Sequence, residues 1–290
     1  MAGVDPSLDP EQKPAPTKAS EPSAEEVWRG ILLGTDPRFG DSHAFFARLP
    51  GNPRCYMCSA PFKGPGSIVA RRMGRRPWAK NPHYCNGCFS LIETQHGGAE
   101  VECSLLFADV RGSTTIAEHM SPTEFRRLLD RFYDAAAGVI HDHGAILDKF
   151  VGDEAVAIFI PALSGELHAA RAVAAGRALL RVTGHGEPGG PWLPIGVGVH
   201  TGIAFVGAVG EGPSSTVTAL GDTVNIAARL GSLAGQGELL VSREAWERGG
   251  LGPAPSERQV GIAGRTGTMT VVATAAEPDP VHDEQPARHD

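Results

Sequence analysis

Two acidic residues stand where apolar, β-rich runs of the sequence end. Asp109 lies near the end of the run V-E-C-S-L-L-F-A-D-V, and Asp153 lies in the turn V-G-D-E between two short apolar segments. A strand end and a hairpin tip both present a side chain to a loop. Two carboxylates brought together suit hard cations, because Mg²⁺ prefers one or two carboxylates together with phosphate oxygens. The pattern predicts a phosphoryl-transfer site, although a single Asp in a turn is also common where no metal binds.

The loop after Asp109 reads R-G-S-T-T and leads into a helical segment. Gly112, Ser113 and Thr114 offer backbone N–H groups and hydroxyls, which hold polyphosphates where a loop enters a helix. We therefore expect phosphate oxygens to bind beside the carboxylates.

Four cysteines form a second set of candidate ligands, arranged as Cys55-x2-Cys58 and Cys85-x2-Cys88. Two such pairs are typical of a tetrahedral metal site. Structural Zn²⁺ explains how a short segment rich in Pro, Gly and Arg could fold, so we favour it. An iron–sulfur cluster or a thiol switch stays as an alternative. The basic run R-R-M-G-R-R between the pairs is either a docking site for a regulatory partner or a solvated loop.

The periodicity of apolar residues predicts the elements that position these groups. A strand at 101–110 precedes a helix that begins with the cap S-P-T-E at Ser121 and ends near Gly144. The predicted elements that follow are strands at 145–148 and 155–160, a helix at 165–182, strands at 195–200 and 204–210, a helix at 222–233, and strands at 238–242 and 269–274. The order β-α-β-β-α-β predicts a ferredoxin-like α/β (α+β) sandwich.

Composition divides the chain into four parts. Residues 1–23 and 277–290 are rich in Pro and charged side chains, and we expect disordered tails there. Residues 24–98 form an N-terminal region with the cysteine module, and residues 99–276 form the larger α/β domain. Gly97-Gly98 is the expected hinge between them.

Charge and hydropathy limit the classes of partner. The 290 residues carry a net charge of −7, so there is no basic footprint for a nucleic acid. No apolar run approaches the roughly 18–20 residues of a membrane helix, and the N-terminus lacks the pattern of a signal peptide. We expect a cytoplasmic protein that binds neither nucleic acid nor membrane.

Residues 99–275 resemble the catalytic domain of class III adenylyl and guanylyl cyclases of the bacterial type. The motifs that carry the resemblance are, in order, F-A-D-V-R-G-S-T-T, K-F-V-G-D-E-A-V-A-I-F, G-V-H-T-G and T-A-L-G-D-T-V-N-I-A-A-R-L. The resemblance implies that Asp109, Asp153 and the Val110 carbonyl hold two Mg²⁺ or Mn²⁺ ions per active site.

The remaining roles are also implied by the resemblance. Lys149 matches the purine-selecting lysine, and Thr218 stands at the second base-reading position, which is often Asp in adenylyl cyclases. Asn225 and Arg229, one helical turn apart, match the pair that stabilises the transition state. Arg265 lies near the place of a basic residue that contacts the terminal phosphates.

The expected reaction is the conversion of ATP to 3′,5′-cyclic AMP and pyrophosphate for intracellular signalling. Because the family builds each site from two catalytic domains and this chain carries both halves, we expect a head-to-tail homodimer. Two alternatives stay open, namely a guanylyl or relaxed-specificity cyclase, which Thr218 allows, and a catalytically weak signalling adaptor. A signal acting through the cysteine module is a further expectation.

Overall fold

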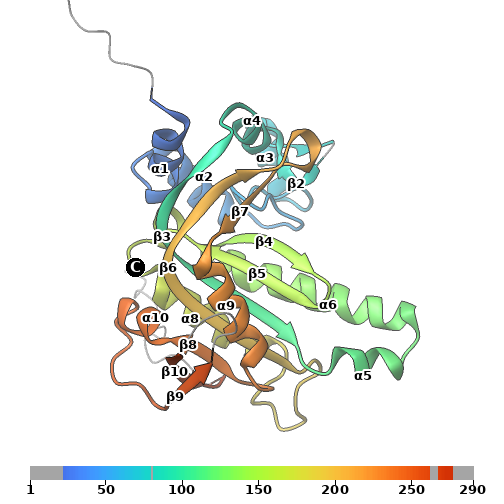
Figure 1. The fold of residues 1–290 in the computed structure, drawn as a ribbon. Helices are drawn as coiled ribbons and strands as arrows, with labels where there is room; N and C mark the ends of the chain where they lie inside the picture. Colours follow the sequence, from blue (N-terminus) through green and yellow to red (C-terminus); the bar gives the residue numbers. More distant parts are fainter. Residues whose placement is uncertain (1–21, 80, 262–266, 277–290) are drawn as a thin grey trace, which may run out of the picture.

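The computed structural model describes residues 22–79, 81–261 and 267–276 (Figure 1). Arg265 and all but two residues of the two expected tails lie outside this part of the chain, so those expectations stay untested.

A mostly antiparallel sheet forms the centre of the fold. Its four central strands are β3 (Gly97–Val110), β4 (Ile146–Val151), β5 (Glu154–Phe159) and β6 (Ile195–Val209). They lie in the order β4-β5-β3-β6, which is the ferredoxin-like order and confirms the predicted fold. Beyond β6 the sheet continues through β8 (Leu239–Ser242), β10 (Thr268–Thr274) and β9 (Glu257–Gly261), and β7 (Thr216–Leu220) pairs with β6. Among the described strands, only β6 and β8 pair in parallel.

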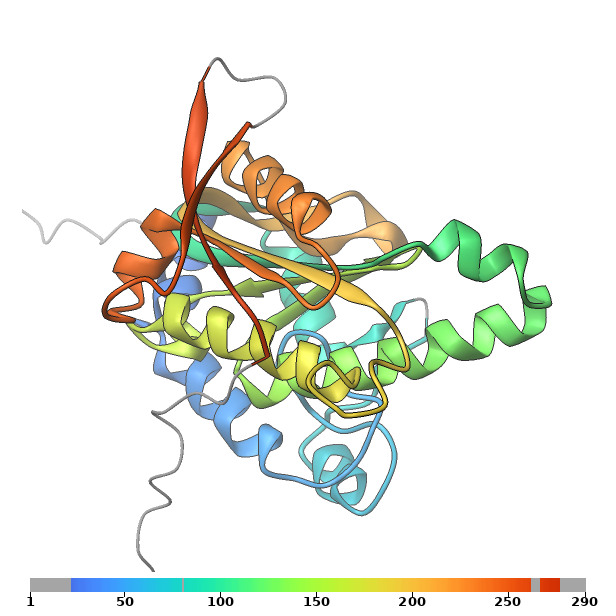
Figure 2. The same ribbon diagram turned by 90° about the horizontal axis from the view of Figure 1, so that it is seen from below.

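Two long helices cover one face of the sheet, as Figure 2 shows. They are α6 (Pro122–Asp142) and α8 (His168–Val182), with the shorter α10 (Arg243–Arg248) beside them. The predicted cap of α6 is present, because the Ser121 hydroxyl accepts from the Glu124 N–H and the Glu124 carboxylate accepts from the Ser121 N–H. Phe132, Ala136 and Ile140 of α6 are buried against the sheet.

The other face is covered by α9 (Asp222–Leu233) and by the N-terminal region. That region contains α1 (Ala24–Leu33), α2 (Pro37–Ala47), α3 (Gly66–Arg72), β1 (Pro77–Trp78), β2 (Asn81–Cys85) and α4 (Asn86–Thr94). Trp28, Tyr84 and Phe89 share one buried cluster with Val101 and Leu105 of β3. The N-terminal region is therefore packed into the core of the sheet.

Gly97 and Gly98 do not form a loop between the two regions. They are the first two residues of β3, paired with Ala208 and Gly207 of β6. A Cβ added to Gly98 would lie 2.7 Å from the Gly207 Cα, and one added to Gly207 would lie 2.3 Å from the Gly98 Cα. The expected hinge is thus wrong, because these glycines allow two strands to approach closely.

The strand β6 is continuous where the sequence predicts two strands. Thr201, Gly202 and Ile203 pair with β3 without interruption. A Cβ on Gly202 would lie 3.0 Å from the Thr223 hydroxyl oxygen, so the glycine provides room for α9. Glycine here marks a close contact and not a strand end.

The short helix α5 (Ser113–Glu118) and the first half of α6 project from the body of the molecule (Figure 1). Phe125, Leu128 and Leu129 on this projection are only half-buried. Two further short helices, α7 (Pro161–Ser164) and η1 (Gly212–Ser214), complete the described elements. No described helix is both long enough and apolar enough to cross a membrane.

Candidate active site

The two aspartates predicted as metal ligands lie at the same edge of the sheet. Asp109 at the end of β3 pairs in register with Glu154, the residue after Asp153. The Val110 N–H donates to the Asp153 carbonyl at 3.3 Å, which joins the end of β3 to the β4–β5 turn. Gly152 in this turn has φ of 61°, a conformation that glycine adopts without strain. Antiparallel pairing therefore brings together three acidic residues from two separate motifs.

The electrostatics of this edge fit a divalent cation. Burial raises the pKa of Asp109, and Asp153 adds to that shift while Arg111 opposes it. Burial, followed by the charges of Asp109 and Asp153, raises the pKa of Glu154 to about 7. Because the pKa values of Asp109 and Glu154 stay raised beside Arg111, its single positive charge does not fully compensate the facing carboxylates. Mg²⁺ or Mn²⁺ would supply the missing positive charge, with the oxygen ligands that such ions prefer.

Arg111 is a site residue that the sequence analysis did not identify. Its Nη2 atom lies 2.9 Å from the Asp109 carboxylate and 2.7 Å from the Gly231 carbonyl. Its Nη1 atom donates to the Ser232 carbonyl at 3.0 Å. Because Gly231 and Ser232 belong to the last turn of α9, Arg111 joins the end of β3 to that helix. The only signal in the sequence is a cation two residues after the first aspartate.

The expected phosphate-binding residues lie beside Asp153. Gly112 has φ of 66° and immediately precedes α5, whose first residues are Ser113 and Thr114. A hollow of about 490 Å³ is lined by Ser113, Thr114, Phe125, Leu129 and Asp153, among others. The hollow lies under the projecting α5 and α6, so one of its walls consists of half-buried apolar side chains.

The two base-reading candidates are in contact. The Lys149 Nζ donates to the Thr218 hydroxyl at 3.1 Å, and that hydroxyl donates to the Asp148 carboxylate at 3.0 Å. Lys149 Nζ also lies 3.3 Å from the same carboxylate oxygen. The structure therefore adds a third residue, Asp148, to the pair that the sequence analysis predicts.

Asp148 reaches this group through an irregularity in β4. The pairing of β4 with β5 shifts register between Leu147 and Lys149, which is a β-bulge. In a regular strand, neighbouring side chains point to opposite faces, whereas a bulge allows Asp148 and Lys149 to meet the same partner. Asp148 is 6% exposed, and its Oδ1 atom is buried without a hydrogen-bond partner. Burial raises the pKa of Asp148, although Lys149 and Thr218 oppose this shift.

Asn225 and Arg229 lie one turn apart on α9. Asn225 is exposed and Arg229 is half-buried, and the Arg229 Nε is buried without a hydrogen-bond partner. No hydrogen bond or ion pair in the described part of the chain joins either side chain to Asp109 or Asp153. The described part of the chain therefore carries the two sets of candidate catalytic groups on different elements, with no hydrogen bond or ion pair between them.

Comparison with known proteins identifies this arrangement. The family described as the adenylate and guanylate cyclase catalytic domain matches residues 98–270. The chain belongs to this family. The resemblance seen in the sequence motifs is thereby confirmed, and the matched residues comprise the sheet from β3 onward together with α5, α6, α8 and α9.

Individual relatives support the same cyclase assignment. An adenylate cyclase of Anabaena cylindrica is 32% identical over 139 residues, which cover 46% of this chain and 27% of the relative. Among solved structures, the guanylyl cyclase Cya2 matches with a TM-score of 0.57 and 27% identity, over 64% of this chain and 98% of that one. The adenylyl cyclase CyaB from P. aeruginosa matches with a TM-score of 0.55 and 25% identity, over 62% of this chain and 97% of that one. This chain spans about a quarter of the length of the curated relatives that it matches. The similar structures therefore include both a guanylyl and an adenylyl cyclase.

The cysteine module precedes the part of the chain that matches the cyclase family. The Sγ atoms of Cys55, Cys58, Cys85 and Cys88 all lie within 4.8 Å of one another, and the four side chains are buried. Cys58 Sγ lies 3.7 Å from Cys85 Sγ. Four thiolates at about 2.3 Å from a tetrahedral Zn²⁺ would be separated by about 3.8 Å. The geometry of the cluster thus fits a tetrahedral metal ion.

Local backbone structure explains this arrangement of the thiols. Cys55 and Cys58 lie in a tight turn closed by a 2.9 Å hydrogen bond from the Ser59 N–H to the Cys55 carbonyl. Cys85 caps α4, and the Cys88 N–H donates to its sulfur at 3.5 Å. The Cys85 N–H donates to the Cys55 sulfur at 3.2 Å. Hydrogen bonds from N–H groups favour the thiolate form that a metal requires.

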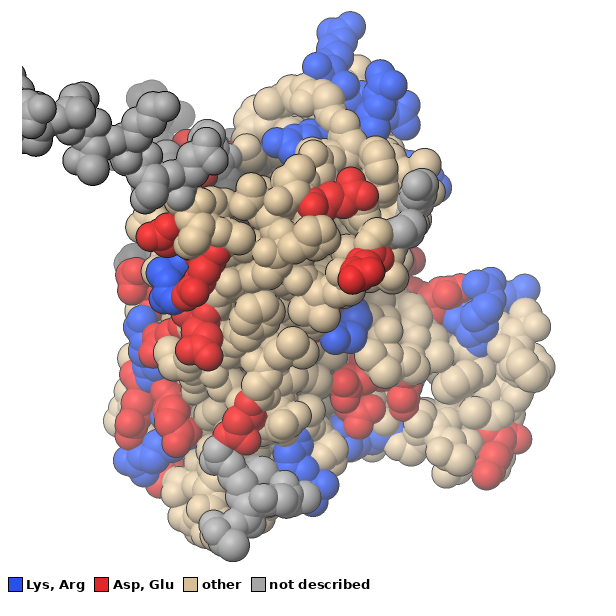
Figure 3. Space-filling model, turned by 45° about the horizontal axis from the view of Figure 1, so that its top comes forward, with Lys and Arg blue, Asp and Glu red and all other residues tan. Residues whose placement is uncertain are grey.

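Basic side chains lie around this cysteine module. The Arg75 Nη1 atom lies 3.7 Å from the Cys85 sulfur. Burial would lower the pKa of Arg75, but the negative sulfurs of Cys85, Cys58 and Cys88 outweigh it and raise the pKa. Figure 3 shows Lys and Arg side chains gathered on the end of the molecule that carries the module, where α3 ends in the exposed Arg71 and Arg72. Arg75 is therefore a charge partner of the cluster, whereas Arg71 and Arg72 are exposed.

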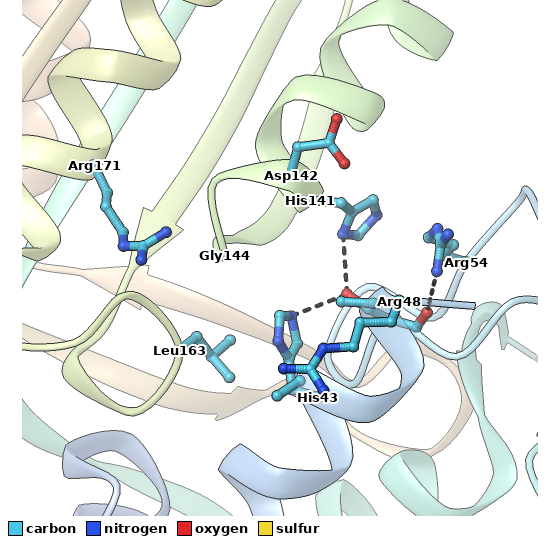
Figure 4. A pocket seen from close by; sticks show the side chains of 11 residues that line it. His43, Arg48, Arg54, His141, Asp142, Gly144, Leu163 and Arg171 are labelled. Atoms are coloured by element: carbon cyan, nitrogen blue, oxygen red, sulfur yellow. Dashed lines mark hydrogen bonds between the residues drawn. The ribbon is translucent and has the colours of Figure 1, made fainter. Parts of the chain in front are cut away.

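A serine between two histidines joins the cysteine module to helix α6. Figure 4 shows His43 of α2 and His141 of α6 on either side of the Ser59 hydroxyl, at 2.9 Å from the His43 Nε2 and 3.3 Å from the His141 Nδ1. Burial lowers the pKa of His43 to about 4 and that of His141 to about 3. Both rings are therefore neutral near pH 7. Because Ser59 follows Cys58, this bridge connects the first cysteine turn to α6.

Proposed function

We propose that the chain is an adenylyl cyclase that converts ATP to 3′,5′-cyclic AMP and pyrophosphate at a homodimer interface. The observation that carries the choice of ATP is the contact of Lys149, Thr218 and Asp148. The family match supports cyclase chemistry, and this contact supports adenine as the base.

The hydrogen-bond donors and acceptors of Lys149, Thr218 and Asp148 match adenine. An ionised Asp148 can only accept a hydrogen bond, so the Thr218 hydroxyl proton is directed to it. The Thr218 oxygen then has lone pairs for the Lys149 ammonium and for one further donor. The 6-amino group of adenine is such a donor, and adenine N1 can accept from Lys149. Guanine in the same pose presents an acceptor at position 6 and a donor at N1, so it matches neither side chain.

Two side chains of α9 are suited to the transition state. Arg229 can hold the charge that develops on the α-phosphate, because a guanidinium donates several hydrogen bonds in a fixed plane. Asn225, one turn earlier, can orient the ribose. When bound at Asp109, Val110 and Asp153, Mg²⁺ or Mn²⁺ would act as a Lewis acid toward the nucleophile and the pyrophosphate. Ser113 and Thr114 would bind the phosphate oxygens beside that site.

The separation of these groups within one protomer supports a head-to-tail dimer. Within the described residues, Arg229 makes no hydrogen bond or ion pair with Asp109 or Asp153, so a second copy would have to supply the missing half of each site. The half-buried Phe125 and Leu129 on the projecting arm supply apolar surface for such a partner. We further propose a structural Zn²⁺ at the four cysteines and a cytoplasmic location, which suits five cysteines that form no disulfide.

The decisive assay supplies ATP and GTP together to the purified chain with Mg²⁺ or Mn²⁺ and measures both cyclic products. Cyclic AMP should dominate. Absence of cyclic product from both nucleotides, with the dimer present, would refute the proposal. Mixing Asp109→Ala chains with Arg229→Ala chains should restore one intact site per heterodimer, and lack of recovery would refute the shared site.

A guanylyl or relaxed-specificity cyclase is the second candidate. The observation in its favour is the similarity to the guanylyl cyclase Cya2 at 27% identity. Dominant cyclic GMP in the same competition would establish it.

A further inference from the structure

The cysteine module is in direct contact with the strand that carries Thr218. The Tyr84 hydroxyl accepts from the Val217 N–H at 3.1 Å and lies 2.8 Å from the Thr216 hydroxyl oxygen. The Asn81 side-chain amide donates to the Ser215 carbonyl at 3.2 Å. Both side chains belong to β2 of the module, and their three partners precede Thr218 by one to three residues. The module therefore holds the start of β7 through side chains.

This contact satisfies an otherwise open strand edge. Within the described residues, β7 pairs with β6 alone, so its other edge has backbone groups without strand partners. Tyr84 is 1% exposed, and a tyrosine hydroxyl can both donate and accept a hydrogen bond. It accepts from Val217 and can donate to Thr216 at the same time. With both hydrogen bonds made, the buried Tyr84 hydroxyl holds the edge of β7 in one position.

Tyr84 also precedes a metal ligand. Cys85 follows it directly, and the Cys85 N–H donates to the Cys55 sulfur. Any metal bound by the cluster therefore fixes the backbone at residue 85, one peptide unit from Tyr84. The path from the cluster to Thr218 runs through Cys85, Tyr84 and Val217, all of which are buried.

The same part of the module adjoins the base-reading group. A cavity of about 300 Å³ is lined by Tyr56, His83 and Tyr84 from the module and by Asp148, Lys149 and Phe150 from β4. The base-reading residues are thus enclosed partly by the module.

We propose that Tyr84 is a positioning residue through which the cysteine module, when loaded with metal, holds Thr218 in the geometry that binds the nucleotide base. The proposal rests on the proposed function for the identity of the base. Metal loading thereby controls nucleotide affinity, while Asp109, Asp153 and Arg229 lie on other elements and keep their arrangement. The expected effect falls on Kd and KM and leaves kcat within about twofold.

The first test compares Tyr84→Phe with wild type in the full-length, metal-loaded protein. The variant keeps the buried ring and removes both hydrogen bonds of the hydroxyl. We expect the Kd for 3′-deoxy-ATP, which binds without reacting, to rise about 5–10-fold by calorimetry. The KM for ATP should rise equally. Thr94→Val is the matched control, because it removes hydroxyl hydrogen bonds on the exposed side of α4, away from β7.

The second test removes the metal with a chelator and monitors metal content and folding. Without metal, the Kd of wild type for 3′-deoxy-ATP should rise by about the same factor as in the metal-loaded Tyr84→Phe variant. Removing the metal from the variant should raise its Kd by less than about twofold more, because both changes release the same strand. Hydrogen exchange of the peptide spanning 215–220 should accelerate in both. If metal removal unfolds the module, the exchange and affinity of metal-loaded Tyr84→Phe still decide the role of Tyr84.

Unchanged affinity and unchanged exchange in Tyr84→Phe would overturn the proposal. The proposal would also be overturned if Tyr84→Phe lowered the affinity for 3′-deoxy-ATP but removal of the metal from folded wild type did not. Failure of the proposed function would be seen differently, as the absence of cyclic product. Binding of 3′-deoxy-ATP and hydrogen exchange could still be measured in such a chain.

Discussion

Replacing Asp148 tests whether a buried carboxylate sets the choice of nucleotide. In Asp148→Ala, the Thr218 hydroxyl loses its acceptor and becomes free to rotate and donate to the 6-oxo group of guanine. A hydrogen bond to a charged group contributes about 1.5–3 kcal/mol. Loss of one such constraint should lower the ratio of kcat/KM for ATP to that for GTP by about 10–100-fold.

The same substitution should leave stability nearly unchanged. The Asp148 Oδ1 is buried without a partner, which costs about 1–3 kcal/mol and offsets the bonds to Thr218 and Lys149. We expect the free energy of unfolding to change by less than about 1 kcal/mol in a urea titration. Altered selectivity in a protein of unaltered stability separates base recognition from a folding defect.

The assay measures kcat/KM for each nucleotide separately, with Glu187→Ala as a control that removes an exposed carboxylate elsewhere. Because burial raises the pKa of Asp148, lowering the pH protonates this carboxyl sooner than an ordinary one and lets it donate to Thr218. The preference of wild type for ATP should therefore weaken at acid pH, and that of Asp148→Ala should not. An equal loss for both nucleotides, or an unchanged ratio, would show that Asp148 has only a structural role.

Three further predictions concern other parts of the molecule. Arg229→Lys should lower kcat by about 10²–10³-fold with KM nearly unchanged, because the ammonium keeps the charge and loses the planar donors; a change confined to KM would contradict this role. Cys58→Ala should release the metal and lower the unfolding free energy, as measured by metal analysis and denaturation, because metal binding contributes directly to folding; full metal content would argue against the site. The pKa values of His43 and His141 are about 4 and about 3 in the folded chain, below the ordinary 6.5. As the pH decreases, the unfolded chain therefore takes up protons first, and the free energy of unfolding should fall below about pH 6.5. Denaturation at pH 7 and 5.5 should show a smaller loss in His141→Gln, by up to about 1.4 kcal/mol, and an equal loss would exclude the ring as the cause.

Local patterns in the sequence were sufficient for several parts of the fold and the candidate site. The cap at Ser121 predicts the start of α6 because capping depends on residues three positions apart. Asp109 is predicted at a strand end and Asp153 at a hairpin tip because each of these features has a local signature. The spacing of the four cysteines likewise predicts a common metal site, since each pair is close in the chain.

Other features depend on residues that are distant in the sequence, and only the tertiary structure decided them. Asp148 reaches Thr218 because a bulge in β4 changes the side to which it points, and alternation of residue types does not reveal a bulge. Arg111 pairs with the end of α9 across the sheet edge. Gly98 is a strand residue because Gly207 lies opposite it. Tyr84 is connected to β7 by a contact between residues more than a hundred positions apart, which the packing of the N-terminal region against the sheet creates. The sequence by itself determined which groups could do the chemistry, and the long-range packing decided which of them meet.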